Sequence, residues 1–325
     1  QEKTYIFDEQ GHKEKARNLR KIKEDEAHEK WLATWGSLRD PRRLRSFEDA
    51  SRQGSSVWLT TLPLKEDHFC LTKQEFRDAL NVRYGITHGL GQRCPACDTT
   101  FDLSHALKCH TGGHVKRRHN EVRDELVDIA KKLNTEVQSE PDLLPITTEH
   151  FSHKSTKTKD NAKPDIMIRG LFQDQQGAYT DVKVFDPAAP SYLGTELESL
   201  YKSQERRKTL FYAERIKNVD HGDFFPAIFS VGGGFGPEID KVLSHISDRL
   251  ATKEKTSKST MKYFLKMRIQ FAIIRGVVRC LRGRREKRLK ERKEYRDVDA
   301  AAIIVEDSGI LRGDNGRVLP ERNKQ

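Results

Sequence analysis

Two acidic residues and a lysine lie near one another at the centre of the chain. Asp165 stands in the run Lys-Pro-Asp-Ile-Met-Ile, and Asp181 and Lys183 stand in the run Asp-Val-Lys-Val. Two converging carboxylates can hold a Mg²⁺ or Mn²⁺ ion, because Mg²⁺ takes one or two carboxylates and keeps several waters. A neighbouring lysine can orient or deprotonate the attacking water, or neutralise charge that develops at phosphorus. The combination favours metal-dependent hydrolysis of a phosphodiester.

The residues around these acids predict a pair of strands. β-Branched and apolar residues flank both acids, and Gly170 with the Gln-rich segment 173–177 forms the predicted turn. Because strand side chains alternate, Asp181 and Lys183 should emerge on one face and the neighbouring valines on the other. The alternative is an ordinary surface hairpin with scattered charges, which explains most isolated Asp-x-Lys matches.

Composition and charge narrow the class of protein. The chain has 325 residues, of which 35% are hydrophobic and 34% charged, and its net charge is +11. This describes a soluble protein long enough for two domains, and the positive charge favours a polyanionic partner. The most apolar stretch, 264–281, is interrupted by four cations, so we expect no membrane span. Five unevenly spaced cysteines and no secretory signal indicate a reducing, intracellular setting.

A second group of residues has the spacing of a zinc site. Cys94 and Cys97 form a Cys-x-x-Cys pair, and His105 and Cys109 follow four residues apart, as on one face of a short helix. Three sulfurs and one imidazole at this spacing predict structural zinc. A redox Cys-x-x-Cys is the alternative, but its usual βαβ context is missing. Three further histidines could compete for the fourth position: His110, His114 and His119.

Basic residues surround the predicted core. An amphipathic helix is expected at about residues 120–133, with Glu121 near its start and a basic cluster before it that could bind phosphates. We also expect a long charged helix within 193–219, a buried strand at 225–231 and a helix at 238–250. The glycine-rich segment 232–237 lacks the Lys-Ser/Thr of a phosphate-binding loop, so we interpret it as a turn. The candidate nucleic-acid contacts are Lys116, Arg117, Arg118, His119, Lys163, Tyr201 and Lys202.

Taken in order, these motifs resemble a known family. The chain carries a Cys-Cys-His-Cys knuckle, Gly-Gly, Arg-His-Asn, a helix, Glu140-Pro141, Lys-Pro-Asp and Asp-Val-Lys-Val. The last two resemble the PD-(D/E)xK core of restriction enzymes and Holliday-junction resolvases. The ordered set, over roughly residues 58–237, resembles the C-terminal region of site-specific non-LTR retrotransposon reverse transcriptase proteins that carry a restriction-like endonuclease.

The resemblance implies a fold and an activity. It implies an α/β restriction-endonuclease-like core, with a mixed central sheet flanked by helices, behind a zinc knuckle and a helical N-terminal region. It also implies a nuclear endonuclease that nicks target DNA for target-primed reverse transcription, with Asp165 and Asp181 as metal ligands and Lys183 as the catalytic lysine. Glu121 matches the helix glutamate of resolvase-like nucleases approximately. The partners would be target DNA and, as a second candidate, element RNA.

The sequence departs from this family at three points. The gap between Asp165 and Asp181 is slightly longer, and Lys183 stands where family members often have Gln. No polymerase motif such as Tyr-x-Asp-Asp is found, so a reverse transcriptase would lie upstream of Gln1 on a longer chain. Two other functions stay open: a zinc-containing nucleic-acid-binding module with a decayed nuclease core, and a transcriptional regulator that reads DNA through the knuckle.

The same patterns divide the chain into segments. We expect a charged helical or linker region, a helical packing segment, the zinc knuckle, the nuclease core, an amphipathic and basic C-terminal helix and a disordered tail. Their expected bounds are, in that order, residues 1–56, 57–90, 91–118, 119–250, 260–300 and 307–325.

Overall fold

The structure, a computed structural model, describes most of the chain. It covers residues 40–285 except 66–67, 88 and 160–161, together with short pieces between residues 18 and 33. Most of the predicted N-terminal linker, the basic run beyond residue 285 and the predicted disordered tail therefore lie outside the described residues.

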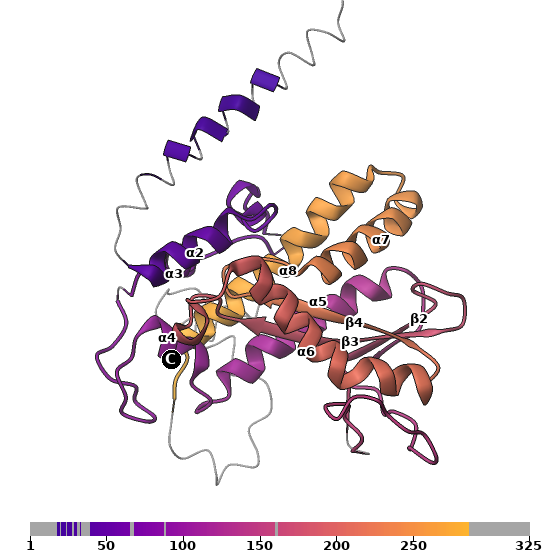
Figure 1. Cartoon of the computed structure of the whole chain (residues 1–325). Coiled ribbons are helices and arrows are strands. Elements are labelled where there is room, and N and C mark those ends of the chain that lie inside the picture. Colours follow the sequence, from indigo (N-terminus) through magenta and orange to yellow (C-terminus); the bar gives the residue numbers. More distant parts are fainter. Residues whose placement is uncertain are drawn as a thin grey trace, which may run out of the picture.

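Four strands form one mixed sheet at the centre of the molecule (Figure 1). In space they follow the order β1, β2, β3, β4. The first three pair antiparallel and β4 runs parallel to β3, so the expectation of a mixed α/β protein is confirmed. The strand bounds are β1 Val137–Ser139, β2 Ile166–Arg169, β3 Gly177–Phe185 and β4 Asp223–Ser230.

The predicted hairpin is β2 and β3. Ile166 pairs with Thr180 and Arg169 pairs with Gly177. Gly170 follows β2 with a φ of +68°, a left-handed conformation that glycine adopts without steric cost. Its N–H donates to the carbonyl of Gln176, which closes the turn at 2.8 Å. The turn and the period-two pattern thus fix the register that brings the two acidic motifs together.

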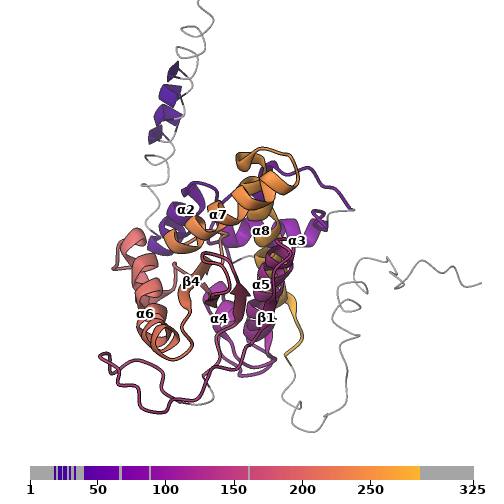
Figure 2. The same cartoon turned by 90° about the vertical axis from the view of Figure 1, so that its right-hand side faces the viewer.

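Helices cover both faces of the sheet. Helix α6 (Leu197–Asn218) lies on one face, and helices α5 (His114–Lys131) and α8 (Lys258–Arg282) lie on the other, as Figure 2 shows. The residues of β3 divide accordingly, because Val182 belongs to the main core with α5 and α8, whereas Phe185 packs with α6. The α6 face therefore holds the odd-numbered residues of β3, Asp181 and Lys183 among them.

The other helices surround this sandwich. Helix α3 begins with a capping box between Thr72 and Glu75, and α7 begins at a proline after Gly236. In the described part of the chain, every helix is too short or too polar to cross a bilayer. The remaining bounds are α2 Pro41–Ser51, η1 Val57–Thr60, α3 Lys73–Arg83, α4 Leu103–Lys108, η2 Pro190–Tyr192 and α7 Pro237–Lys253.

Helix α8 lies in the centre of the core rather than at its edge. The sequence placed residues 260–300 in a separate amphipathic and basic helix, but most of α8 is buried between α5, α7 and α3. Several of its cations meet an acid from a neighbouring helix, whereas Arg275 donates to the main-chain carbonyl of His68. The ion pairs are Arg268 with Glu125, Arg279 with Glu121, Lys266 with Asp240, and Arg282 with Asp78.

The glycine-rich loop after β4 encloses a buried carboxylate. Asp49 of α2 is 1% exposed and accepts hydrogen bonds from the hydroxyls of Tyr201 at 2.6 Å and Ser230 at 2.5 Å. A Cβ added to Gly234 would lie 2.2 Å from the Tyr201 hydroxyl and 2.8 Å from Asp49 Oδ1. Gly234 has no side chain because the Asp49 network fills the space. This agrees with the interpretation as a turn.

We predict that Gly234→Ala lowers the free energy of unfolding by about 1–3 kcal/mol, the usual effect of overpacking a filled core. Urea unfolding followed by circular dichroism measures it. Gly194→Ala is the matched control, because no atom lies within 4 Å of the added Cβ there. Equal stabilities of the two variants would show that the Asp49 network is not closely packed.

Candidate functional site

The α6 face of β3 carries a row of paired side chains. Phe185 packs against Tyr201 with ring centroids 5.1 Å apart, the Lys183 amine donates to Gln204 Oε1 at 2.6 Å, and Asp181 forms an ion pair with Lys208. Partners are spaced by two residues on the strand and by three or four on the helix. Two strand residues span about 6.6 Å and four helical residues about 6 Å, so the two elements stay in register.

Asp165 lies beside this row, immediately before β2. Its Oδ1 lies 2.9 Å from Nε2 of His119 on α5, and its Oδ2 accepts the main-chain N–H of Val182 at 2.6 Å. Its own N–H donates to the carbonyl of Thr180 at 2.9 Å. Because both oxygens are held, the Asp165 carboxylate is fixed toward β3 and next to Asp181.

The two carboxylates act on each other electrostatically. Burial raises the pKa of Asp181, the cation of Lys208 opposes that rise, and the negative charge of Asp165 adds to it. Burial, followed by the charges of Asp181 and Asp165, also raises the pKa of Tyr212 on α6. Such a pair of acids is stabilised by any cation placed between them. Lys208 supplies positive charge to Asp181 in this arrangement.

Lys183 has an unusual environment for a lysine. Burial, with help from the cations of Arg207 and Lys208, lowers the pKa of its amine to about 8, and only Asp181 opposes this shift. At neutral pH a measurable fraction of the amine is therefore uncharged. An amine with a pKa near the working pH can take up and release a proton.

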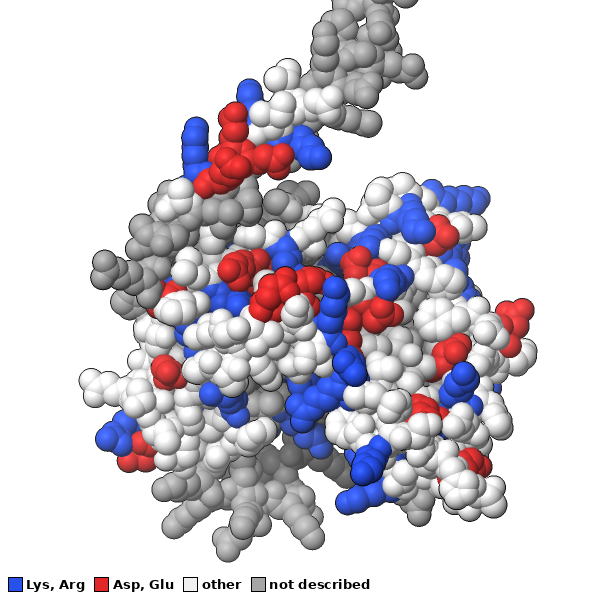
Figure 3. Space-filling view, viewed as in Figure 1, with Lys and Arg blue, Asp and Glu red and all other residues white. Residues whose placement is uncertain are grey.

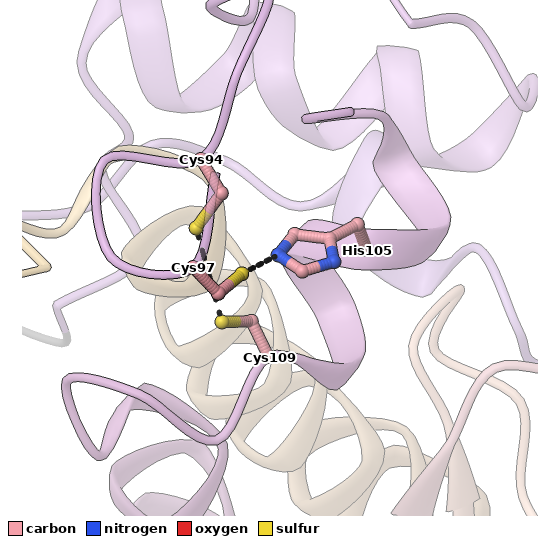
Figure 4. Close-up of side chains that lie close together, drawn as sticks. All are labelled: Cys94, Cys97, His105 and Cys109. Carbon is pink, nitrogen blue, oxygen red and sulfur yellow. Dashed lines mark hydrogen bonds between the residues drawn. The ribbon is translucent and has the colours of Figure 1, made fainter. Parts of the chain in front are cut away.

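The four predicted zinc ligands meet at one point (Figure 4). Their ligand atoms all lie within 4.8 Å of one another. Sulfurs at the corners of a zinc tetrahedron lie about 3.8 Å apart, since each Zn–S bond is about 2.3 Å. Cys94 Sγ and Cys109 Sγ are 3.9 Å apart, and Cys97 Sγ is 3.3 Å from His105 Nε2. The four residues could hold a metal ion, and their arrangement is compatible with structural zinc.

Neighbouring groups suit the same ion. His105 Nδ1 lies 3.1 Å from the Thr99 hydroxyl, which would orient the ring and leave Nε2 for the metal. Hydrogen bonds, first that of the Thr99 side chain, lower the pKa of Cys97 to about 7 and so favour the thiolate that zinc requires. Asp102 caps α4 through the N–H of His105 and fixes the start of that helix. His105 is therefore the fourth ligand that the geometry supports.

The knuckle is joined to the sheet by Arg118. This arginine is 4% exposed, and its guanidinium donates to the carbonyl of Leu107 in α4 and to that of Val184 in β3, each at 3.2 Å. Cys94 and Cys109 also belong to the main hydrophobic core. The segment 91–118 is thus not packed as an independent unit. The prediction that Arg118 binds nucleic acid is wrong, because the side chain is buried and both arms are used internally.

Two other predicted residues lie away from the carboxylates. Glu121 pairs with Arg279 of α8. Residues two apart on a helix point about 200° from each other, so α5 turns His119 toward Asp165 and Glu121 toward α8. Tyr201 is fully buried and donates to Asp49, which excludes the predicted contact with nucleic acid.

The remaining predicted nucleic-acid contacts lie at the surface. Lys116 and Arg117 at the start of α5 and Lys202 on α6 are exposed. Lys163 is exposed too and forms an ion pair with Asp142 at 2.5 Å. These side chains remain candidates for phosphate contacts.

Sequence reasoning did not assign Gln204, Lys208 and Tyr212 to the site. They recur every four residues along α6, which was a usable signal, but polar residues in a charged helix are usually solvated. Only the strand opposite them shows that this stripe faces inward.

Comparisons with known proteins do not identify a family or a function for this chain. No family model matches the chain, and no curated protein matches it.

We predict that the Lys183 amine titrates at about 8 in the folded protein. NMR of ¹³Cε-labelled lysine followed against pH measures it, with Lys183→Arg to assign the signal. Arg207→Ala removes one neighbouring cation and should raise this pKa. Because the unfolded chain holds its proton up to about 10.5, it binds more protons between the two pKa values, and the Lys183 contribution to stability rises with pH there. Titration in the ordinary lysine range would refute the assigned environment.

We predict that the chain binds one zinc ion and that Cys97→Ser or Cys109→Ser loses it. Elemental analysis of purified protein gives the zinc content, and Co²⁺ substitution gives the absorption of a tetrahedral thiolate site. Cys70→Ser is the control, because its thiol donates to the carbonyl of Pro63, outside the four-ligand cluster. Wild-type protein that refolds without zinc and takes up no Co²⁺ would contradict the prediction.

Proposed function

We propose that this chain is a metal-dependent DNA endonuclease with a restriction-endonuclease-like fold. The observation that carries the proposal is the placement of Asp165, Asp181 and Lys183 together at the β2–β3 hairpin, against α6. A mixed sheet with helices on both faces supports the finer fold assignment that the sequence resemblance implies. Two acids and an amine of lowered pKa in one place are typical of an active site rather than of a surface hairpin.

Asp165 and Asp181 would hold the ion. When bound, Mg²⁺ or Mn²⁺ supplies a Lewis acid for the scissile phosphate and lowers the pKa of a water. His119 and the Val182 N–H keep the Asp165 carboxylate in place. Lys208 would then no longer be needed as the counter-ion of Asp181. Lys208 could then neutralise charge on the phosphate.

Lys183 would act on the water. Gln204 holds its amine at 2.6 Å, and the lowered pKa leaves part of it uncharged at neutral pH. The amine would accept a proton from the water as its oxygen attacks phosphorus. The P–O3′ bond would break, and the leaving oxygen would take a proton and become a 3′ hydroxyl. A 3′ hydroxyl at a nick is what target-primed reverse transcription uses, so the retroelement context follows from the resemblance.

The surface around the site suits DNA. Figure 3 shows Lys and Arg side chains gathered over α6 at the centre of this face. The exposed cations of α6 include Lys202, Arg206 and Arg207, and Lys116 and Arg117 lie exposed on α5 beyond the sheet. A net charge of +11 adds a general attraction for nucleic acid. Zinc would serve the fold and not the reaction, since all four positions are filled by protein ligands.

One observation favours a second candidate function. Lys208 already neutralises Asp181, and an ammonium held there can replace a metal ion permanently. In that case the chain would be a zinc-containing DNA-binding module whose nuclease centre no longer turns over. Both candidates predict salt-dependent DNA binding, and only the nuclease predicts a nicked product that requires a divalent cation.

We predict that the protein nicks supercoiled plasmid DNA with Mg²⁺ or Mn²⁺ and that Asp181→Asn or Lys183→Ala lowers the rate at least about 100-fold, the order expected for a metal ligand or proton-transfer group. Gel electrophoresis of the nicked product measures the rate.

Asp174→Asn makes the same substitution in the β2–β3 turn, where the side chain is exposed, and should leave nicking unchanged. Lys208→Ala should lower the rate of a nuclease, because it removes the cation proposed to neutralise charge on the phosphate; nicking by the wild-type protein separates the two candidates. Nicking that survives in Asp181→Asn protein would rule out the proposed site.

A further inference from the structure

A long connection without regular structure lies between β1 and β2. We call residues 144–159 the pinned loop. Loops of more than about 12–15 residues are uncommon in compact domains and usually carry function. Figures 1 and 2 show the β1–β2 connection projecting from the body below the sheet and beside α6. Its last residues lead, through 162–164, directly into Asp165.

The second half of α6 holds this loop in one conformation. Glu214 accepts the main-chain N–H groups of Ser152 and His153 and the hydroxyl of Thr156. These bonds, first that of the Ser152 N–H, lower the pKa of Glu214 to about 2. The carboxylate therefore stays ionised, and the loop stays attached, throughout the physiological pH range.

Arg215 holds the two ends of the same loop from inside. It is fully buried, and its guanidinium donates to the carbonyls of Lys157, Lys159 and Leu144, at 3.1, 2.7 and 3.2 Å. A buried arginine that satisfies three loop carbonyls is a costly way to order a segment with no role. An ordered loop binds a partner more tightly than a mobile one, because its conformational entropy has already been lost on folding.

The outer surface of the pinned loop is basic. It carries Lys154, Lys157 and Lys159 against one acid, Glu149, which accepts N–H groups of its own loop. Within the described residues none of these three lysines forms an ion pair with a carboxylate. The Lys157 amine lies 6.0 Å from the ring of Tyr212, the α6 residue beside Asp181. The loop thus continues the positive surface of α6 from the carboxylates outward.

We propose that the pinned loop is a preformed arm that binds the phosphate backbone of duplex DNA beside the scissile bond. The partner rests on the proposed function, which makes DNA the substrate. The duplex is favoured over a single strand because the exposed side chains of the loop are mainly cations and hydroxyls, and none of them is a Phe, Tyr or Trp ring on which an unpaired base could stack. The imidazoles of His150 and His153 are its exposed aromatic groups. Its lysines give affinity and position, and they do not read sequence.

The test measures DNA binding apart from cleavage. Full-length protein is titrated onto a short labelled duplex in buffer without Mg²⁺ or Mn²⁺, and the affinity is followed by fluorescence anisotropy over a range of salt. We expect Lys154→Ala, Lys157→Ala and Lys159→Ala together to reduce the slope of log K against log salt by about 2.7, at about 0.9 per phosphate contact. Affinity at about 0.1 M salt should fall roughly ten-fold or more.

A matched control removes the same charge elsewhere. Lys131, Lys132 and Lys255 are exposed at the far end of α5 and after α7. Their triple alanine variant should change the slope by less than about 0.9, the value of one phosphate contact, because salt screens charges that lie far from the DNA. Equal effects of the two triple variants would mean that net charge alone acts, which overturns the proposal.

A third variant tests the pinning. Glu214→Ala keeps all three lysines but frees the loop, so we expect weaker binding with the salt slope retained, and faster hydrogen exchange at the Ser152 and His153 N–H groups. Unchanged affinity with a freed loop would remove the claim that the arm is preformed. The same titration is repeated with RNA. If the triple lysine variant loses affinity for RNA but keeps its affinity for duplex DNA, the choice of duplex DNA is overturned.

The outcome is independent of nicking. A chain that binds duplex DNA through the loop but never cleaves it keeps this inference and loses the nuclease. A chain that cleaves DNA while the lysine variant binds like the control keeps the nuclease and loses this inference.

Discussion

The candidate site depends on the match between β3 and α6. A strand advances about 6.6 Å in two residues and a helix about 6 Å in four, so one row of contacts can continue over several residues without slipping. The row begins with the aromatic contact of Phe185 with Tyr201 and continues with the polar contacts of Lys183 with Gln204 and of Asp181 with Lys208. The contact between Phe185 and Tyr201 thus sets the register of β3 against α6, and this register places Lys183 opposite Gln204 and Asp181 opposite Lys208.

Ion pairs between neighbouring helices explain how a highly charged chain can have a large core. Helix α8 carries Arg268, Arg279 and Arg282 at the margin of the core, where their side chains are 19, 21 and 33% exposed and acids from α5 and α3 meet them. Removing an acid would leave its arginine without a counter-charge at a partly exposed position, where solvent offsets much of the loss. The ion pairs therefore specify which helices lie next to α8, even where they add little net stability.

Much of the site could be predicted because its signals are local. The period-two pattern and Gly170 predict the hairpin, and the spacing of four cysteine and histidine ligands predicts their cluster. The α6 residues that contact β3 could not be predicted, because in the sequence Gln204 and Lys208 look like solvated residues of a charged helix. Only the position of β3 opposite them shows that they face inward. Glu121 was misplaced because an approximate motif match cannot tell which side of a helix faces the sheet. Arg118 and Tyr201 look like surface groups in sequence, and only long-range contacts with Val184 and Asp49 bury them.

The position of α8 has a consequence for biosynthesis. This helix, which ends at Arg282, fills the space between α5, α7 and α3, so the hydrophobic faces of those three helices have no cover until it is made. The β2–β3 hairpin is local in sequence, but the interior cannot close before residue 282 has left the exit tunnel. During that interval, the apolar faces that α8 will cover are open to solvent.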